Sequence, residues 1–290
     1  MDDFSSGRRE NVPARVTVHE MDVSSPAFRK LVGSSGFDIV VHLAAQIDVR
    51  KSVADPAADA ATNILGTLAL MEGIRASGKQ TRVVFSSTGG VLYGTFTTPP
   101  NLETYPKDPE SPYAISKLST EYYLAYYGRV HGIPSVSLRF GNVYGPRQDP
   151  HGEAGVIAIF CGNILSGKPL TVFGDGLQTR DYIYVSDVCD AIYRAAEQTL
   201  PEPERLDSRA FNIGTGAGTT VLQLIEGLRK VSGAAAEVVF APHRPGEQQD
   251  SFVDAGKAAE LLGWRPKVGL DRGLGLTFEW FRNSEKSRGG

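Results

Sequence analysis

Short apolar runs alternate with longer amphipathic segments through the first half of the chain, and this alternation restricts the fold more than any other feature. Residues 37–44 and 82–86 are rich in β-branched residues and too short for helices, which predicts buried strands. Residues 59–77 have helical spacing and end at Gly78, and Pro112–His131 begins with proline and ends before Gly132. A further strand at 135–139 and a helix at 186–198 complete a β-α-β-α-β-α order, which predicts a doubly wound parallel sheet of the α/β class.

The second half of the chain changes character after Tyr144, where glycine and proline become more frequent and the predicted elements become shorter. These elements are strands at 170–173, 210–213 and 237–241 and a helix near 221–231. We therefore expect residues 1–144 to form one domain and residues 145–290 a smaller α/β lobe, with 180–198 returning to the first domain. The polar tail, residues 283–290, is expected to be disordered.

Composition excludes several classes of function. The chain of 290 residues carries 30 basic and 33 acidic residues, so it has no cationic excess with which to bind nucleic acid or an anionic membrane. The sequence has no run of about 20 apolar residues and no signal peptide at its start, and we expect a cytoplasmic protein with small-molecule partners. Cys161 and Cys189 each lie in an apolar stretch, which predicts buried thiols. The histidines lack metal-ligand spacing, so we expect no metal site and a core position for His42.

The beginning of the chain fits a dinucleotide-binding fold least well. Such a fold starts with a strand, a glycine-rich turn and a helix, and an acidic residue follows about 20 residues later at the end of the second strand. Asp2 and Asp3 stand at the position of that acid, so we expect the first strand and glycine turn to be absent, through a start at an internal Met or a natural truncation. A chain of this kind is expected to bind a dinucleotide weakly and to aggregate readily.

A second glycine-rich segment, residues 211–220, lies between a predicted strand and a predicted helix. Its sixth position is Thr219, where a dinucleotide-binding turn needs glycine for close helix–strand packing. This spacing favours a tight turn capped by Thr219 or Thr220 over a dinucleotide site.

Tyr113 and Lys117 lie four residues apart in a predicted helix, on one face and about 6 Å apart along the axis. A phenol with a pKa of about 10 is a weak base at neutral pH, but a cation about 6 Å away lowers that pKa by about two units at an effective dielectric of about 20. An oxidised nicotinamide nearby would lower it further. Taken alone, the pair is a weak signal and is better explained as an ordinary surface contact.

Hydroxyl groups follow the predicted strand 82–86, in the sequence Ser86-Ser87-Thr88-Gly89-Gly90. Ligands bind at the carboxyl edge of open α/β sheets, so Thr88 could relay a proton between Tyr113 and a substrate alcohol. The alternative is a strand-end turn with solvated hydroxyls.

Nine segments, in order and over nearly the whole length, resemble the extended short-chain dehydrogenase/reductases, and within them the nucleotide-sugar 4-epimerases of the UDP-glucose 4-epimerase type. These segments are residues 2–11, 42–53, 63–67, 86–94, 113–117, 139–147, 174–176, 180–187 and 244–247. The resemblance implies a Rossmann-type NAD-binding domain followed by a lobe that binds a nucleotide-diphosphate sugar. It implies an isomerase that epimerises C4 of UDP-glucose, UDP-galactose or an N-acetylated analogue by transient oxidation, and a homodimer formed through the helices 59–77 and Pro112–His131.

The resemblance also implies individual roles. Tyr113 is the expected general base, Lys117 its partner and a nicotinamide-ribose ligand, and Thr88 the hydroxyl on the substrate side. The expected cofactor ligands, besides Tyr113 and Lys117, are Asp2 and Asp3 at the adenosine ribose, Asp22 and Val23 at the adenine, Ala44, Ala45 and Gln46 along the dinucleotide, and Asn63 on the adenine side.

The implied substrate ligands are Asn142, Arg180 and Arg244 at the diphosphate, and Ser251 beside the sugar. A guanidinium fork matches phosphate oxygens, although a single arginine could equally form a surface ion pair. Ser251 stands seven residues after Arg244, where many relatives restricted to plain hexoses carry a bulky tyrosine.

Two alternative functions remain open. A nucleotide-sugar 4,6-dehydratase resembles this family but needs an acid pair directly after the strand-end threonine, where this sequence has Gly89-Gly90. A truncated, non-catalytic relative would bind a nucleotide sugar or a partner without turnover.

Overall fold

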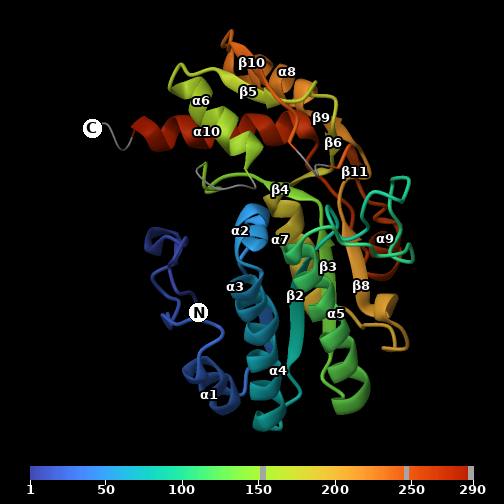
Figure 1. Cartoon of the computed structure of the whole chain (residues 1–290). Helices are drawn as coiled ribbons and strands as arrows, with labels where there is room; N and C mark the ends of the chain where they lie inside the picture. The colour runs from blue at the N-terminus through green and yellow to red at the C-terminus, as the bar shows by residue number, and fades with distance from the viewer. Residues whose placement is uncertain (151–154, 245–247, 287–290) are drawn as a thin grey trace. The chain divides into compact units, whose positions relative to one another are not determined.

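The computed structural model describes residues 1–150, 155–244 and 248–286, which form two compact units (Figure 1). The first unit contains Met1–Ser87, Ser111–Leu138 and Ala195–Ala210, and the second contains Thr88–Glu110, Arg139–Arg194 and the described residues after Ala210. Tyr144, the expected boundary, lies inside the second unit. Residues 195–210 belong to the first unit, and they include the last part, 195–198, of the segment expected to return to it.

The main sheet has the strand order β1-β2-β3-β8 and confirms the predicted α/β class. Strands β1 and β2 pair in parallel, with Ile39 opposite Arg82 and His42 opposite Phe85. Each strand lies within or next to a segment predicted as a strand from the sequence. The strands are β1 (Ile39–His42), β2 (Arg82–Thr88), β3 (Ser135–Phe140) and β8 (Ala210–Ile213).

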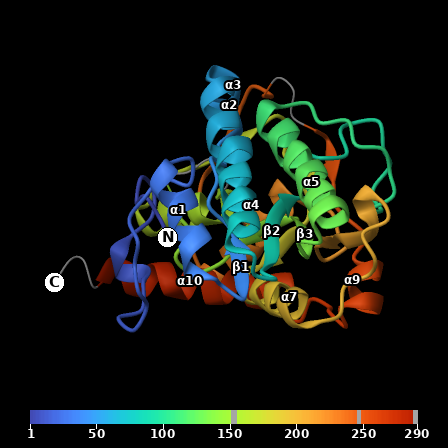
Figure 2. The same cartoon turned by 90° about the horizontal axis from the view of Figure 1, so that it is seen from below.

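Helices α4 (Gly66–Ser77) and α5 (Pro112–His131) lie side by side over one face of β1 and β2 in the first unit (Figure 2). Their inner faces form a core with Val83 and Phe85. The single helix predicted for 59–77 is interrupted, because a π-helical turn separates two α-helical parts. The remaining helical segments of this unit are η1 (Arg9–Asn11), α1 (Pro26–Ser35), α2 (Val49–Ala54), α3 (Pro56–Ala60), the π-helical turn η2 (Ala61–Leu65) and η3 (Leu206–Arg209).

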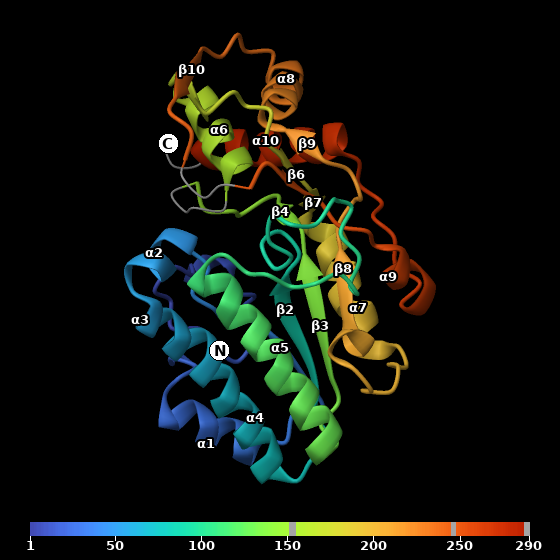
Figure 3. The ribbon, with the colours of Figure 1, turned by 45° about the vertical axis from the view of Figure 1, so that its right-hand side comes forward.

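The second unit contains three small sheets and a helical layer. Strands β4 (Asn142–Tyr144) and β7 (Tyr182–Tyr184) pair in parallel, as do β5 (Leu170–Phe173) and β10 (Val238–Ala241). Strand β6 (Thr179–Arg180) lies between β11 (Asp250–Ser251) and β9 (Thr219–Thr220). Helix α10 (Leu270–Lys286) packs against α6 (Val156–Leu165) and α8 (Val221–Ser232) around an apolar core (Figure 3). Helices α7 (Val185–Glu197) and α9 (Gly256–Leu261) complete the unit's secondary structure, α7 ending in the first unit.

Several expectations are corrected or sharpened. Cys161 is buried as predicted, but Cys189 is exposed because it lies on the outer side of α7. Residues 283–286 of the tail continue α10 and are helical, while 287–290 lie outside the described residues. The segment 211–220 is strand and turn, and Thr220 caps α8 by accepting a hydrogen bond from the Gln223 N–H, as the spacing favoured.

The described ranges contain neither a metal-binding cluster nor a membrane-spanning helix. No group of three or more His, Cys, Asp or Glu side chains among the described residues is arranged to hold a metal ion. His151, one of the five histidines of the chain, lies outside those residues. None of the helices in the same ranges combines the length and the apolar character that a membrane span requires.

His42 closes β1 as a buried core residue, and its burial predicts a pH-dependent stability. Its Nε2 lies 3.0 Å from Thr67 Oγ1, and burial, with a smaller effect of the Lys117 charge, lowers the pKa of His42 to about 3. As the pH falls below 6.5, the unfolded chain takes up a proton that the folded chain excludes, so this group lowers the free energy of unfolding by about 1.4 kcal/mol per pH unit.

We expect His42→Gln to abolish this pH-dependent loss of stability. The free energy of unfolding of the variant, relative to that of the wild type, should therefore rise from pH 6 to pH 4. Urea unfolding at several pH values measures this difference. A difference that stays constant over this range would contradict the assignment.

Candidate functional site

The structure brings Tyr113 and Lys117 together near the amino-terminal end of α5. Lys117 is buried, and its Nζ donates a hydrogen bond to the Ser86 carbonyl of β2 at 2.8 Å. The same nitrogen lies 5.8 Å from the centre of the Tyr113 ring and 4.8 Å from that of Phe85. Tyr113 is itself anchored, because its N–H donates to Ser52 Oγ at 3.2 Å. The predicted pair is therefore a built arrangement and not a surface contact.

Burial sets the charge properties of this pair. It lowers the pKa of Lys117 to about 8, against the opposing influence of Asp59 and Glu121. Burial and the negative charge of Asp59 raise the pKa of Tyr113 above its usual value. From the sequence, Lys117 is expected to lower the pKa of Tyr113 by about two units, and an oxidised nicotinamide to lower it further. In the chain by itself, burial and Asp59 prevail and the pKa stays raised. A further positive charge near the phenol is required before it can act as a base at neutral pH.

Asp59 is a site residue that the sequence reasoning missed. This buried carboxylate accepts hydrogen bonds from Gln46 Nε2 at 2.9 Å, Asn63 Nδ2 at 3.0 Å and Ser116 Oγ at 2.6 Å. It therefore links two expected cofactor ligands to the residue that precedes Lys117. Asp59 and Asn63 lie four residues apart on one helix face, and this spacing could have indicated that their side chains are in contact.

The loop after β1 is fixed by the same helical segment. Gln46 N donates to Asn63 Oδ1 at 2.9 Å, and Asn63 Nδ2 donates to the Gln46 carbonyl at 3.0 Å. This reciprocal pair holds the stretch that also contains Ala44 and Ala45, both of which are partly exposed. Gln46 and Asn63 are thus joined by hydrogen bonds, and Ala44 and Ala45 directly precede Gln46 in the chain.

The remaining expected cofactor residues form a separate group at the start of the chain. The backbone carbonyl of Asp2 accepts a hydrogen bond from Met21 N at 3.1 Å, so this segment lies beside the one that carries Asp22. Asp3 and Asp22 each bind a backbone N–H two residues ahead, at 3.0 Å and 2.6 Å. Val23 is buried and packs against Gly66, where a Cβ would come within 2.7 Å of Val23 Cγ2.

Three expected substrate residues gather around Gly90 in the second unit. A Cβ placed on Gly90 would lie 3.5 Å from Asn142 Oδ1 and 4.0 Å from both Thr88 Oγ1 and Ser251 Oγ. Ser251 is buried, and its hydroxyl donates to the Gly90 carbonyl at 2.7 Å. Thr88, Asn142 and Ser251 lie far apart in the sequence but close together around Gly90. We call these three residues the Gly90 cluster.

The two arginines have different surroundings. Arg180 pairs with Ser251 in the β6–β11 register, and its Nη1 donates to the Thr179 carbonyl at 2.7 Å. The Arg244 guanidinium lies over the ring of Phe173, with 3.8 Å between its carbon and the ring centre. Residues 245–247, which complete the motif, lie outside the described residues. Arg180 is therefore directly joined to the Gly90 cluster, and Arg244 is oriented by an aromatic face.

Gly89 has no room for a side chain. A Cβ at this position would lie 2.9 Å from Val253 Cγ1 and 3.0 Å from the Arg139 carbonyl. An acidic side chain directly after Thr88 would therefore require displacement of backbone, which is costly in a packed interior. The position directly after Thr88 therefore does not fit the first residue of the acid pair on which the dehydratase alternative depends.

Comparison with known proteins gives a consistent result. The family pattern described as GDP-mannose 4,6 dehydratase matches residues 1–277. A protein of Mycolicibacterium smegmatis named UDP-glucose 4-epimerase is 40% identical over 291 residues, which cover 99% of this chain and 91% of the relative.

Two solved structures are similar over almost the full chain. The UDP-glucose 4-epimerase of Thermotoga maritima, solved with UDP-glucose, is 44% identical with a TM-score of 0.92, over 98% of this chain and 90% of that one. The UDP-glucose 4-epimerase of Thermus thermophilus, solved with NAD, is 41% identical with a TM-score of 0.88, over the same shares. With a family pattern that spans most of its length, this chain belongs to the family of NAD-dependent nucleotide-sugar epimerases and dehydratases described as GDP-mannose 4,6 dehydratase.

Proposed function

We propose that this protein is an NAD-dependent nucleotide-sugar 4-epimerase that interconverts UDP-glucose and UDP-galactose or their N-acetylated analogues. The observation that carries the proposal is the buried Lys117, held on the Ser86 carbonyl beside Tyr113. The relatives in M. smegmatis, T. maritima and T. thermophilus carry the name of this activity. The proposal includes a cytoplasmic location, which agrees with the free thiols of Cys161 and Cys189.

The residues around Tyr113 fit the nicotinamide ribose of NAD. An ammonium has three N–H donors, and Lys117 directs one to Ser86, so the group has further capacity for ribose hydroxyls. NAD, when bound, takes up and returns the hydride at C4 and contributes positive charge. Tyr113 accepts the proton of the C4 hydroxyl, and the added charge offsets the raised pKa that burial and Asp59 give the phenol.

The second unit supplies the substrate ligands in this proposal. Arg180, Arg244 and Asn142 bind the diphosphate through charge-assisted hydrogen bonds. Thr88 supplies a hydroxyl on the substrate side; it is the last residue of β2, two residues after the carbonyl that holds Lys117. Firm binding at the diphosphate leaves the sugar free to turn, which inversion at C4 requires.

Incubation of the protein with UDP-glucose, UDP-N-acetylglucosamine and their galacto epimers, with and without added NAD, tests the proposed function. Chromatography is expected to show interconversion at C4 within at least one pair. A 4-keto-6-deoxy product would establish the dehydratase reaction instead. Binding of NAD and nucleotide sugar without any product would establish the non-catalytic alternative.

Ser251 in place of a bulky aromatic residue predicts acceptance of N-acetylated sugars. Its small side chain ends in the Gly90 cluster, so Ser251→Tyr should fill space beside the sugar. We expect this variant to lower turnover of the UDP-N-acetylhexosamine pair about 10-fold more than that of the plain hexose pair, because a lost or blocked apolar pocket costs about 1–3 kcal/mol. Equal losses on both pairs would show that Ser251 does not face the sugar.

We further propose that the protein is a homodimer that uses the outer face of α5. Four exposed side chains follow one another along this helix at spacings of seven, four and four residues, which places them on one face. They are Ile115, Tyr122, Tyr126 and Val130. Light scattering is expected to give twice the chain mass, and Tyr122→Glu to shift it toward the monomer. A monomeric wild type would contradict this part of the proposal.

A further inference from the structure

Asp181 is a buried carboxylate to which the proposed reaction gives no role. It lies between β6 and β7 and is 1% exposed. Its Oδ1 accepts hydrogen bonds from Thr215 N at 2.7 Å and Thr215 Oγ1 at 2.6 Å. Its Oδ2 accepts from Gly216 N at 3.2 Å and Val253 N at 3.3 Å. Four donors converge on one side chain, as a buried acceptor requires.

The donors at Thr215 and Gly216 belong to the glycine-rich turn within residues 211–220. The N–H groups of such a turn can bind an external phosphate, but here they bind a carboxylate of the same chain. Gly214 is also explained by this contact, because a Cβ at that position would collide with Asp181 Oδ2. Gly214 therefore permits the close approach of Asp181 to the turn.

The backbone of Asp181 joins the segments that carry the proposed substrate ligands. Its N–H donates to the Ser251 carbonyl at 3.0 Å, and its carbonyl accepts from Asn142 N at 2.6 Å. Arg180 precedes it in the chain. A Cβ at Gly141, the residue before β4, would lie 2.7 Å from the Asp181 carbonyl oxygen. The backbone at this position therefore approaches Asp181 too closely for any residue other than glycine.

We propose that Asp181 is a positioning residue for nucleotide-sugar binding, whose carboxylate locks the Thr215–Gly216 turn and the Val253 segment around the strands that present Asn142, Arg180 and Ser251. The inference rests on the proposed function, because it takes these three residues as substrate ligands. Burial raises the pKa of Asp181, and its four hydrogen bonds act in the opposite direction. Because the hydrogen bonds of its carboxylate are all made to Thr215, Gly216 and Val253, the side chain acts through these neighbours and not by touching the substrate.

Asp181→Asn tests this role at constant shape. In either orientation of the amide, its NH₂ group faces two N–H or O–H donors that formerly donated to one carboxylate oxygen. Two of the four hydrogen bonds are therefore lost. We expect the dissociation constant for UDP, measured by titration calorimetry with NAD present, to rise about 10-fold or more. The KM for UDP-glucose should rise by a similar factor, while kcat stays within about 3-fold.

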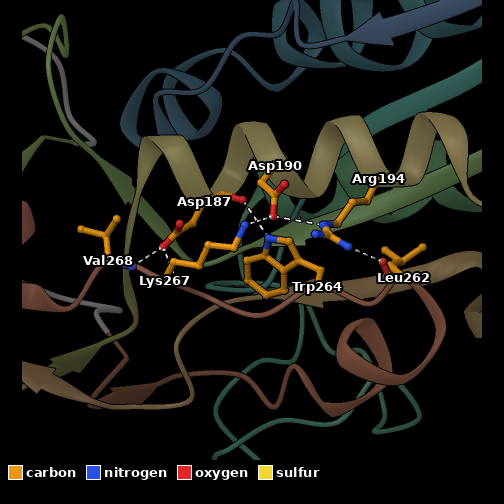
Figure 4. A network of polar contacts seen from close by, with 7 residues as sticks. All are labelled: Asp187, Asp190, Arg194, Leu262, Trp264, Lys267 and Val268. Atoms are coloured by element: carbon orange, nitrogen blue, oxygen red, sulfur yellow. Dashed lines mark hydrogen bonds and ion pairs between the residues drawn. The ribbon is translucent and has the colours of Figure 1, made fainter.

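Asp187→Asn is the matched control within the same unit. Asp187 is also buried, and its Oδ2 accepts from Lys267 N and Val268 N, both at 2.9 Å (Figure 4). Trp264 Nε1 donates to its carbonyl at 2.9 Å. These partners anchor the segment before α10 to α7 and do not include Asn142, Arg180 or Ser251. The variant is expected to lower the melting temperature while leaving the dissociation constant for UDP within about 2-fold.

Thr215→Val provides a milder variant if Asp181→Asn does not fold. It keeps the β-branched shape and the backbone N–H, but removes the hydroxyl that donates to Asp181 Oδ1. We expect it to weaken UDP binding about 3-fold or more, within the range measured for single hydrogen bonds.

The outcomes separate the inference from the function on which it rests. Asp181→Asn decides when it folds, and Thr215→Val decides when it does not. Weaker UDP binding by the deciding variant, with unchanged binding by Asp187→Asn, supports the positioning role. Wild-type affinity in the deciding variant overturns it, and so does an equal loss in the Asp187 control. A wild type that does not bind UDP overturns the proposed function itself and this inference with it.

Discussion

Replacing Tyr113 by phenylalanine is expected to lower turnover by about 10²–10⁴-fold, the usual effect of losing a general acid–base group. The ring and its packing remain, and the anchoring bond to Ser52 comes from the backbone N–H of residue 113, which the substitution keeps. The melting temperature and the affinity for UDP should therefore change little. The measurement is the rate of UDP-glucose epimerisation at saturating substrate and NAD, together with UDP calorimetry.

Tyr123→Phe is the matched control for this experiment. Tyr123 lies on the same helix and is 40% exposed, so the loss of its hydroxyl should leave the rate within about 2-fold. If Tyr113→Phe retains a rate close to that of the wild type, another group removes the C4 proton. A loss of UDP affinity equal to the loss of rate would instead indicate that Tyr113 binds substrate.

The sequence predicted those elements whose pattern is set locally. Pro112 and Gly132 define both ends of α5, since proline fits the first helical turn and Gly132 adopts the left-handed conformation with φ of 67°. Strands β1 and β2 of the main sheet follow from their short β-branched runs. The break within 59–77 was not predictable in this way, because Ala61–Leu65 contains neither proline nor glycine to mark its wider turn.

The candidate site was predictable only in part, for a related reason. Tyr113 and Lys117 share a helix face by spacing alone, and the structure places their side chains together. The gathering of Thr88, Asn142 and Ser251 at Gly90 depends on three strand ends that are distant in sequence. Asp59 and Asp181 carry no local signal of burial, because a single aspartate in a helix or after a strand is usually solvated. Their roles emerge only from the donors that surround them.

Replacing Lys117 by methionine is expected to lower turnover by about 10²-fold or more at pH 7, although methionine fills a similar volume. A cation about 6 Å from a phenolate contributes roughly 2.8 kcal/mol at an effective dielectric of about 20, which is about two pKa units of Tyr113 and about 100-fold in its ionised fraction. Burial and Asp59 raise the pKa of the phenol, and the variant also lacks the ammonium, whose Nζ lies 5.8 Å from the centre of the Tyr113 ring.

The pH profile gives this prediction a second readout. Because burial lowers the pKa of Lys117 to about 8, the wild type carries the charge below that pH and loses it above, so its rate should decline on the alkaline side of pH 8. Lys117→Arg keeps the charge at all accessible pH values, since the guanidinium has a pKa above about 12. We expect this variant to be slower at pH 7, because the guanidinium group does not match the site, but to lack the decline near pH 8.

Rates of UDP-glucose epimerisation from pH 6 to pH 10 measure both effects. An identical alkaline decline in Lys117→Arg would assign that decline to another group, and a methionine variant within about 3-fold of the wild type at pH 7 would remove Lys117 from the catalytic pair.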